Sequence, residues 1–590
     1  MNNNSISFEI NKLRICLDKN SQIPTLETNS KIIIEPGDKI LIIGESGSGK
    51  TIFLKSIACL FDHKIVEFIG SFCYSGQLVN FQSYKIYKKN IKKIFGRYLC
   101  MLHQDAINHL HPYRSIASQL SECYFGDKKA KKINIVNSCN DVDLVRLINS
   151  EANRNINNDY NILSNTKRIN LSGGMCQRVG IASVLIQEPM LVIADEPLSD
   201  LDITSRNTIK KLLFNKILNN KQTTVLFATH DPVIISQNTI FNKLFLTHDN
   251  TITQITQIPK KWNNCSLDKN ENIILSNNKP KETILFSKMP VKYKYPDSNH
   301  WAVDTASQKY NINIVKGQHL GIVGETGSGK STLARLISFL IRTESNFFLM
   351  NKNFKKQSFN DSGNLIYNNI QVVFQDTLGS INTKETIESG IKRLKKKRGF
   401  NDIIVKNLLD DIGLSYNEIS TKYPFELSMG MLRRFFLVKA YLGLTPIKKD
   451  EMPKILILDE ITRGLDPINR KRVFDFLINL NSQDITIIAI SHDLDFVQKL
   501  CNHIIVMYNG WIVEEKIFND KISFKQINWK HPYSKTLWNK SELKILTSSN
   551  IEKACKFFKY CKQSDLKKCL VNANINKQIN GLNGWHFCIS

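Results

Sequence analysis

Nearly uninterrupted runs of apolar residues recur along the chain, and each run ends at glycine, acidic or histidine residues. Examples are KILIIG (39–44), LVIADE (191–196) and TTVLFATH (223–230). Strands that are buried on both faces of a parallel sheet have this pattern. The first run continues into GESGSGKT and then TIFLKSIACL, which is the order strand, loop, helix. The pattern predicts an α/β fold with a largely parallel sheet.

The same series of runs and motifs occurs twice. The second copy contains LGIVGETGSGKST (320–332), ILILDE (455–460) and an ISHD segment that includes His492. The offset between copies shrinks steadily along the chain, as expected of two homologous domains with different insertions. We expect a first domain in residues 1–255, a linker in 256–283, a second domain in 284–525 and a C-terminal extension in 526–590.

Composition agrees with two globular domains. The 590 residues are 42% hydrophobic and 23% charged, which suffices for two cores. No stretch approaches the roughly 18 consecutive apolar residues that span a bilayer, and the start MNNNSISFEINK does not resemble a secretory signal. The net charge of +27 comes from scattered lysines. Because these lysines form no single basic arm and have no aromatic ladder beside them, we expect solvated faces or weak attraction to anionic lipid, and nucleic acid is an unlikely partner.

Both glycine-rich segments fit a loop that cradles phosphates. In the first, glycines let backbone N–H groups turn inward, where side chains would block the approach. Lys50 supplies a positive charge for the β and γ phosphates, and Thr51 offers its hydroxyl to Mg²⁺. The candidate ATP-binding residues of the two loops are Gly44, Glu45, Ser46, Gly47, Ser48, Gly49, Lys50, Thr51, Gly324, Glu325, Thr326, Gly327, Ser328, Gly329, Lys330, Ser331 and Thr332.

Acidic pairs follow a buried strand in each copy. Asp195 is expected to hold the metal, and Glu196 to polarise the water that attacks the terminal phosphate. His230 ends the next strand, from which it could reach the γ phosphate. The second copy repeats this set as Asp459, Glu460 and His492, so the candidate catalytic residues are Glu196, His230, Glu460 and His492.

A third motif lies between the loop and the acidic pair. It reads LSGGMCQR (171–178) in the first copy and LSMGMLRR (427–434) in the second. LSGG before a helix is the signature of the ATP-binding-cassette (ABC) ATPases, and the chain resembles that family in both copies. The resemblance implies two tandem P-loop NTPase domains, each with a helical signature subdomain, that bind ATP and Mg²⁺ and hydrolyse ATP.

The resemblance also implies ligands outside the glycine loops. Gln104 and Gln375 resemble the family's glutamine loops, which sense metal and nucleotide. The implied signature contacts to ATP are Ser172, Gly173, Gly174, Ser428 and Gly430. The implied Mg²⁺ ligands are Thr51, Gln104, Asp195, Ser331, Gln375 and Asp459.

Cassettes of this family pair head to tail, so each nucleotide is expected between one cassette's loop and the other's signature. The Lys330 site would then face LSGG, and the Lys50 site LSMGM. Met429 adds bulk that weakens the Lys50 site if it faces the nucleotide, and changes little if it points away. The first alternative predicts that Lys330→Ala lowers the ATPase rate more than Lys50→Ala.

The C-terminal extension narrows the resemblance. HPYSKTLW (531–538) followed by cysteines is similar to the end of the oligopeptide, dipeptide and nickel importer ATPases. The implied cofactor is an iron–sulfur cluster, of the [4Fe–4S] type, held by Cys555, Cys561, Cys569 and Cys588. The spacing is poor for zinc, and unligated thiols in a basic tail are the alternative.

The resulting hypothesis is the ATP-hydrolysing subunit of an ABC importer for peptides or a related small solute such as nickel. Its expected partners are two membrane permeases and a separate solute-binding protein, with the chain on the cytoplasmic side of the inner membrane. The alternative is a tandem ABC ATPase that acts on ribosomes. The adenine-stacking residue stays open, with Tyr293 or Tyr295 considered for the second copy and Phe8 or Cys16 for the first.

Overall fold

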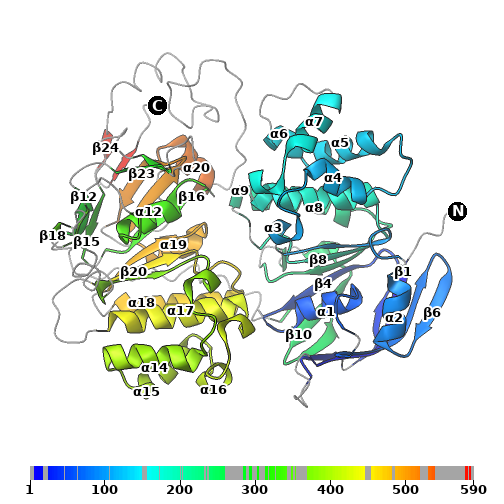
Figure 1. Ribbon diagram of the computed structural model, residues 1–590, viewed down its shortest axis with the longest axis horizontal. Coiled ribbons are helices and arrows are strands. Elements are labelled where there is room, and N and C mark those ends of the chain that lie inside the picture. The colour runs from blue at the N-terminus through cyan, green and yellow to red at the C-terminus, as the bar shows by residue number, and fades with distance from the viewer. Residues whose placement is uncertain are drawn as a thin grey trace. The chain divides into compact units, whose positions relative to one another are not determined.

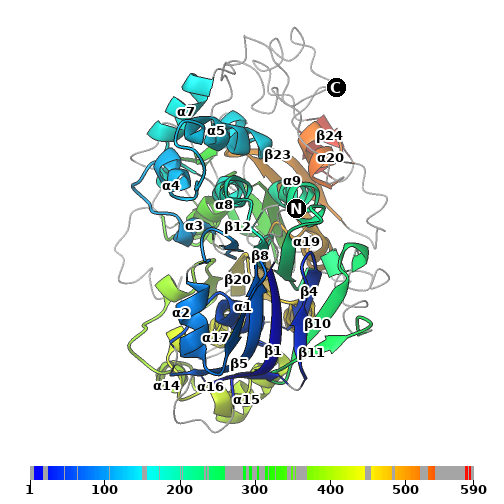
Figure 2. The same cartoon turned by 90° about the vertical axis from the view of Figure 1, so that its right-hand side faces the viewer.

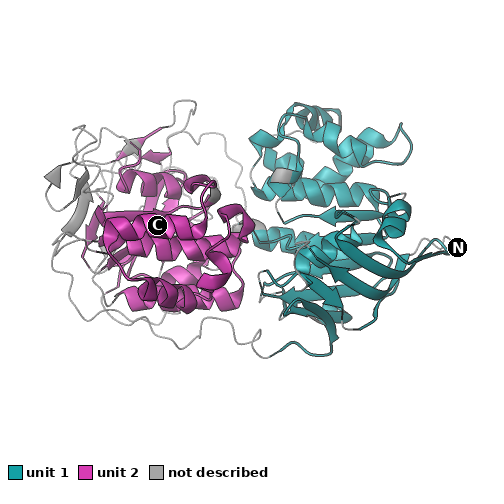
Figure 3. Ribbon diagram, turned by 60° about the horizontal axis from the view of Figure 1, so that its bottom comes forward, with its two compact units in different colours: residues 1–201, 205–266 teal, residues 202–204, 267–590 magenta. Residues whose placement is uncertain are grey.

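The structure is a computed structural model in which two compact units can be distinguished. It describes residues 6–16, 24–28, 30–45, 47–62, 64–92, 94–104, 106–148, 156–171, 173–199, 201, 203–231, 234–235, 238–259, 283–287, 291–294, 302–304, 312–316, 318–325, 327–341, 347–349, 352–353, 368–445, 454–481, 485–518, 529–538, 579–581 and 584–586. Unit 1 comprises residues 1–201 and 205–266, and unit 2 comprises residues 202–204 and 267–590 (Figure 3).

Unit 1 is built on one mixed sheet. Its described strands are β1 (Ile6–Ile15), β2 (Leu26–Thr28), β3 (Ile32–Ile34), β4 (Lys39–Gly44), β5 (Val66–Tyr74), β6 (Gln77–Phe81), β7 (Leu99–Leu102), β8 (Leu191–Asp195), β9 (Thr224–Ala228), β10 (Lys243–His248) and β11 (Thr251–Ile255). Their order is β6-β5-β1-β2-β11-β10-β4-β9-β8-β7, with β3 paired to β1. The run β10-β4-β9-β8-β7 is parallel. The continuous apolar runs therefore form the parallel part of the sheet, as predicted.

Several helices of unit 1 form a group of their own. Its described helices are α1 (Lys50–Ile57), α2 (Tyr84–Ile91), α3 (Ala106–His109), α4 (Ile116–Glu122), α5 (Lys131–Asp141), α6 (Leu144–Ile148), α7 (Ile156–Asn165), α8 (Gly173–Gln187) and α9 (Ile203–Leu212). In Figures 1 and 2, α4, α5 and α7 lie together, away from β1. They pack on one another, and α4 and α5 also pack on α8. This group is the helical subdomain expected around the signature segment.

Unit 2 repeats the central strand order. Its described strands are β12 (Thr283–Ser287), β13 (Lys292–Tyr293), β14 (Val303–Asp304), β15 (Asn313–Val315), β16 (Leu320–Gly324), β17 (Phe347–Leu349), β18 (Lys352–Asn353), β19 (Ile370–Val373), β20 (Lys454–Asp459), β21 (Ile485–Ile490), β22 (His503–Tyr508), β23 (Trp511–Ile517), β24 (Ile579–Gly581) and β25 (Gly584–His586). The main sheet runs β19-β20-β21-β16-β22-β23-β25-β24. Its first five strands are parallel and match β7-β8-β9-β4-β10 in position and direction. The two units thus share topology as well as motifs.

Two smaller sheets and a set of helices complete unit 2. The strands β15-β12-β17-β18 form one small sheet, and β13 pairs with β14. The described helices are α12 (Lys330–Ile337), α14 (Ile387–Arg398), α15 (Asp402–Asp411), α16 (Tyr416–Ile419), α17 (Met429–Leu444), α18 (Pro467–Asn481), α19 (Leu494–Leu500) and α20 (Pro532–Trp538). Helices α14 and α15 pack against α17, as Figure 1 shows. Among the described residues, no helix combines the length and apolar character needed to cross a bilayer.

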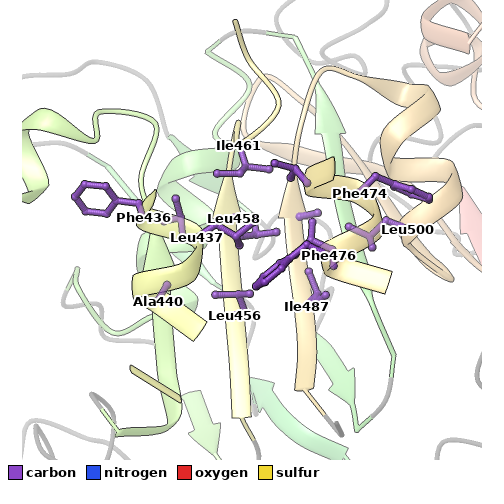
Figure 4. Packing of buried hydrophobic residues seen from close by; sticks show 14 of the residues in the cluster. Phe436, Leu437, Ala440, Leu456, Leu458, Ile461, Phe474, Phe476, Ile487 and Leu500 are labelled. Atoms are coloured by element: carbon purple, nitrogen blue, oxygen red, sulfur yellow. The ribbon is translucent and has the colours of Figure 1, made fainter. Parts of the chain in front are cut away.

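The largest core of unit 2 joins its sheet to the signature helix. Leu437 of α17, Leu458 of β20 and Phe476 of α18 belong to one cluster of buried side chains (Figure 4). The same cluster includes Trp529 and Tyr533, from the beginning of the C-terminal extension. This part of the extension therefore packs into the second domain's core.

Candidate functional site

In unit 1, the glycine-rich loop connects β4 to α1 and folds around its own lysine. Gly49 has φ 103° in the left-handed region directly before α1, a conformation that a side chain would strain. The Lys50 side chain is buried, and its Nζ donates to the carbonyl oxygens of Gly44 and Glu45, both at 2.9 Å. The loop thus holds a positive charge at the N-terminus of α1, where phosphate groups bind favourably.

Unit 2 repeats this geometry between β16 and α12. Gly329 has φ 98°, and a Cβ atom there would lie 2.0 Å from the Ala302 carbonyl oxygen. Lys330 Nζ donates to the carbonyl oxygens of Gly324 at 3.0 Å and Glu325 at 2.7 Å. The two loops therefore present the same charge in the same setting, as their sequences predict.

The predicted metal-binding carboxylates meet the loop hydroxyl groups. Thr51 Oγ1 donates to Asp195 Oδ1 at 3.1 Å, and Ser331 Oγ donates to Asp459 Oδ1 at 3.1 Å. Burial raises the pKa of both Asp195 and Asp459 to about 6. A carboxylate beside a hydroxyl is the oxygen donor set that Mg²⁺ takes together with nucleotide phosphates. The residues present therefore fit the metal that the family implies.

Each predicted base is paired with its predicted histidine. Glu196 Oε1 lies 2.9 Å from His230 Nδ1 and 3.5 Å from Lys50 Nζ. Glu460 Oε2 lies 2.6 Å from His492 Nδ1. Both glutamates have positive φ, 45° and 56°. Non-glycine residues adopt such angles rarely, and mostly where the surroundings require them.

Burial and these partners act in opposite directions on the two glutamates. Burial alone would raise the pKa of Glu196, but the nearby His230 and Lys50 lower it to about 2. The pKa of Glu460 is likewise lowered, because His492 and Lys330 outweigh burial. Burial would lower the pKa of His492, yet Glu460 raises it. Both glutamates are therefore ionised at neutral pH, as a group that polarises water must be.

The glutamines lie at the same edge of each sheet. Gln104 follows β7 and Gln375 follows β19, strands that run parallel to the ones carrying Asp195 and Asp459. Parallel strands end at one edge of the sheet, which is where ligands bind in open α/β folds. The structure thus brings each glutamine to the side of the sheet that carries the acidic pair.

The signature segments begin the long helices α8 and α17. Ser428 caps α17, and its Oγ accepts a hydrogen bond from the Met431 N–H at 3.2 Å. The Met429 side chain is 42% exposed. Gly173 and Gly174 begin α8. The effect of Met429 on the Lys50 site stays a prediction.

Several predicted positions lie outside the described residues. They are Ser46, Thr326, Ser172, Tyr295 and the four cysteines Cys555, Cys561, Cys569 and Cys588. Within the described ranges, no group of three or more histidine, cysteine or acidic residues is placed to hold a metal ion.

One adenine-stacking candidate is wrong. Phe8 is only 1% exposed and stacks on Phe72, with 5.8 Å between ring centroids. It belongs to the core of unit 1, because alternate positions of β1 face inward. Its side chain is therefore not available to a nucleotide base.

Sequence analysis missed one arginine in each signature helix. Arg434 donates to the carbonyl oxygens of Ile412 at 2.7 Å and Gly413 at 2.9 Å. Arg178 donates to the Val142 carbonyl oxygen in unit 1. Each buried arginine fastens the signature helix to the residues that follow another helix of the same unit, α5 in unit 1 and α15 in unit 2. The shared final R of LSGGMCQR and LSMGMLRR was the available signal.

Comparison with known proteins relates the chain to one family. The model of the ABC transporter family matches residues 28–199 and 307–463. The peptidoglycan transport ATP-binding protein YejF of Agrobacterium fabrum is 27% identical over 512 residues, covering 81% of this chain and 87% of that protein. The glutathione import ATP-binding protein GsiA of Salmonella choleraesuis is 26% identical over 586 residues, covering 90% and 88%. A solved dimeric ATP-binding cassette bound to ADP and phosphate is 22% identical, covers 40% of this chain and 98% of its own, and has a TM-score of 0.34.

Proposed function

The chain belongs to the ABC transporter family, and we propose that it is the ATP-hydrolysing subunit of an importer for peptides or a related small solute. It is an ATPase with two fused cassettes. The observation that carries the proposal is that both units hold a full set of loop lysine, hydroxyl–aspartate pair and glutamate–histidine pair. Neither cassette has therefore lost the groups that hydrolysis needs.

The roles of these groups follow from their positions. Lys50 and Lys330 would bind the β and γ phosphates, exchanging loop carbonyls for phosphate oxygens. Thr51 with Asp195, and Ser331 with Asp459, would hold Mg²⁺, which neutralises charge that develops on the phosphates.

Hydrolysis needs a group that orients the attacking water. The ionised Glu196 and Glu460 would accept a hydrogen bond from that water, because each carboxylate is held by its histidine beside the loop lysine's site. His230 and His492 keep the carboxylates oriented. The signature residues of one cassette are proposed to complete the other cassette's site, as in the family.

Import rather than another use of ATP is supported by the relatives. Glutathione import and peptidoglycan transport are the activities in the names of two relatives that match along most of their length. The HPY segment of the C-terminal extension supports the peptide and nickel branch. The proposed partners are two membrane permeases and a separate solute-binding protein, with the chain on the cytoplasmic face of the inner membrane.

Uptake by intact cells tests this proposal. Cells that produce the chain should accumulate labelled oligopeptide, glutathione or Ni²⁺ faster than cells producing a Glu196→Gln/Glu460→Gln double variant. The wild-type chain, purified from solubilised membranes, should bring permeases with it. Recovery with ribosomal particles instead, and no difference in uptake, would contradict an importer and favour a role in translation.

The iron–sulfur cluster remains a separate proposal. Cys555, Cys561, Cys569 and Cys588 would hold it, on the resemblance of the extension to the importer ATPases. Anaerobically purified protein should contain iron and acid-labile sulfide, and a Cys561→Ser variant should contain less of both. Equal and negligible contents in both proteins would show that the thiols are unligated.

A further inference from the structure

The phosphate-binding loop of unit 2 is held by a residue that lies far away in the sequence. The backbone N–H of Glu325 donates a hydrogen bond to the hydroxyl oxygen of Tyr533 at 2.9 Å. The carbonyl oxygen of the same residue accepts from Lys330 Nζ at 2.7 Å. Glu325 directly follows β16, so the tyrosine fixes the point where the chain leaves the sheet and enters the loop.

Tyr533 is itself fixed from several sides. Its side chain is 1% exposed, and its ring lies 4.7 Å from that of Tyr508. Its N–H donates to His531 Nδ1 at 3.1 Å. The backbone N–H groups of Lys530 and His531 donate to the two carboxylate oxygens of Glu514 at 2.9 and 3.0 Å. The position of the ring is therefore set by β22, by β23 and by the start of α20, all of which lie outside the loop.

The loop of unit 1 has a different support. There, Thr247 of β10 lies beside the last residue of β4, and its Oγ1 is 2.6 Å from Ser48 Oγ in the loop. The corresponding residue of β22 is Met507, which has no hydroxyl. Consequently the buried Ser328 Oγ finds no hydrogen-bond partner in the part of unit 2 that the structure describes.

The sequence shows that the loop of the first cassette has no counterpart of the Tyr533 support. Residues 256–283, which follow the first cassette as residues 529–538 follow the second, contain no tyrosine. The first cassette thus has no tyrosine at the position equivalent to Tyr533. A side chain of the neighbouring strand supports the loop of unit 1. The loop of unit 2 is supported by the C-terminal extension and by the Gly510 N–H, which donates to the Ser328 carbonyl oxygen at 2.9 Å.

We propose that Tyr533 is a positioning residue of the second ATP site alone, and that the extension 529–538 thereby sets the ATP affinity of that site. The mechanism is geometric, because a fixed Glu325 N–H keeps the loop in the shape that wraps the phosphates. Preorganised binding groups cost less to order when the ligand arrives. This inference rests on the two ATP sites proposed above and on no property of the transported solute.

Nucleotide binding to full-length variants tests it. In a Lys50→Ala chain, only the Lys330 site should bind a fluorescent ATP analogue with Mg²⁺ tightly. Adding Tyr533→Phe removes the hydroxyl but keeps the ring, and should weaken this binding by about tenfold, equivalent to about 1.4 kcal/mol. In a Lys330→Ala chain, Tyr533→Phe should have no effect. Thr247→Val is the matched change in unit 1, and should weaken binding only in the Lys330→Ala chain.

Two controls separate positioning from loss of structure. Trp538 stacks on Trp529 at 3.9 Å between centroids, at the far end of α20, so Trp538→Leu disturbs the extension without removing the hydroxyl. It should affect the urea midpoint more than Tyr533→Phe, and ATP affinity less. With both sites intact, Tyr533→Phe should raise KM for ATP with little change in kcat, because the lost interaction stabilises the ground state and the transition state equally.

The outcomes distinguish this inference from the site assignment. Unchanged affinity after Tyr533→Phe in the Lys50→Ala chain, or equal weakening in both lysine backgrounds, would overturn the positioning role. If Lys330→Ala and Lys50→Ala leave the number of bound nucleotides unchanged, the assigned ATP sites themselves are wrong, whatever Tyr533→Phe does.

Discussion

Replacement of Glu460 by glutamine is the sharpest test of the proposed chemistry. The change keeps the size of a side chain that is only 10% exposed, and removes the charge that lies 2.6 Å from His492 Nδ1. Because His492 and Lys330 keep the pKa of Glu460 low, the wild-type group is ionised at assay pH. The variant therefore removes a base and leaves the surrounding contacts nearly in place.

The size of the effect follows from the role assigned to the carboxylate. A positioned base typically contributes about 10²–10⁴ in rate, which corresponds to about 2.7–5.5 kcal/mol in the activation barrier. If the two sites turn over independently, Glu460→Gln or Glu196→Gln alone leaves about half of the rate. The double variant should then fall to about 1% or less.

Phosphate release at saturating Mg²⁺ and ATP measures these rates. Binding of a fluorescent ATP analogue should survive in all variants, because the lysines and aspartates are unchanged. Glu388→Gln serves as the control, since Glu388 pairs with Lys392 on the exposed face of α14, and it should leave the rate intact. A double variant that keeps more than about a tenth of the wild-type rate would refute the assignment of these glutamates as bases.

Two further predictions concern the frame of the second site. Arg434→Met should lower the free energy of unfolding by about 2–4 kcal/mol, because buried carbonyls lose charge-assisted hydrogen bonds. Arg393→Met, which breaks an exposed ion pair, should lower it by under about 1 kcal/mol. Urea titration of both variants measures these losses, and losses of similar size would contradict the argument from burial. Gly329→Ala should abolish ATP binding at the Lys330 site, because the new Cβ would meet the Ala302 carbonyl oxygen at 2.0 Å. Gly327→Ala, with φ 82° but nothing within 4 Å of the new Cβ, should only weaken binding. Equal losses of affinity for the fluorescent ATP analogue in both variants would show that backbone strain, and not the clash, is the cause.

The parts of the site that lie at the ends of parallel strands could be predicted from the sequence. A continuous apolar run followed by Asp195 and Glu196 places both carboxylates at the edge of the sheet, and the glycine loop leads to the same edge. The lysine, hydroxyl and carboxylate groups of both units meet as expected. Their positions follow from local pattern and from the common direction of the strands.

Contacts between distant segments could not be predicted in this way. The residues joined by the Glu325–Tyr533 hydrogen bond are separated by 208 positions, and no periodicity in either segment indicates the other. The buried arginine Arg434 is similar, because a charged residue in a helix normally suggests an exposed face. Phe8 shows the converse error. An aromatic residue near the start of a domain suggests a surface that stacks on adenine, but this side chain is buried in the core.

Apart from Met429 in the second signature segment, the asymmetry between the two cassettes lies in how each phosphate-binding loop is supported. The groups that act on ATP are present in both units at nearly equal distances. These groups therefore do not distinguish one cassette from the other. What differs is the residue that steadies each loop, a threonine on the neighbouring strand in unit 1 and a tyrosine from the C-terminal extension in unit 2. Displacement of residues 529–538 would therefore change the ATP affinity of the second site only. A fused pair of cassettes can in this way have one ATP affinity that is intrinsic and one that depends on the docking of a separate segment.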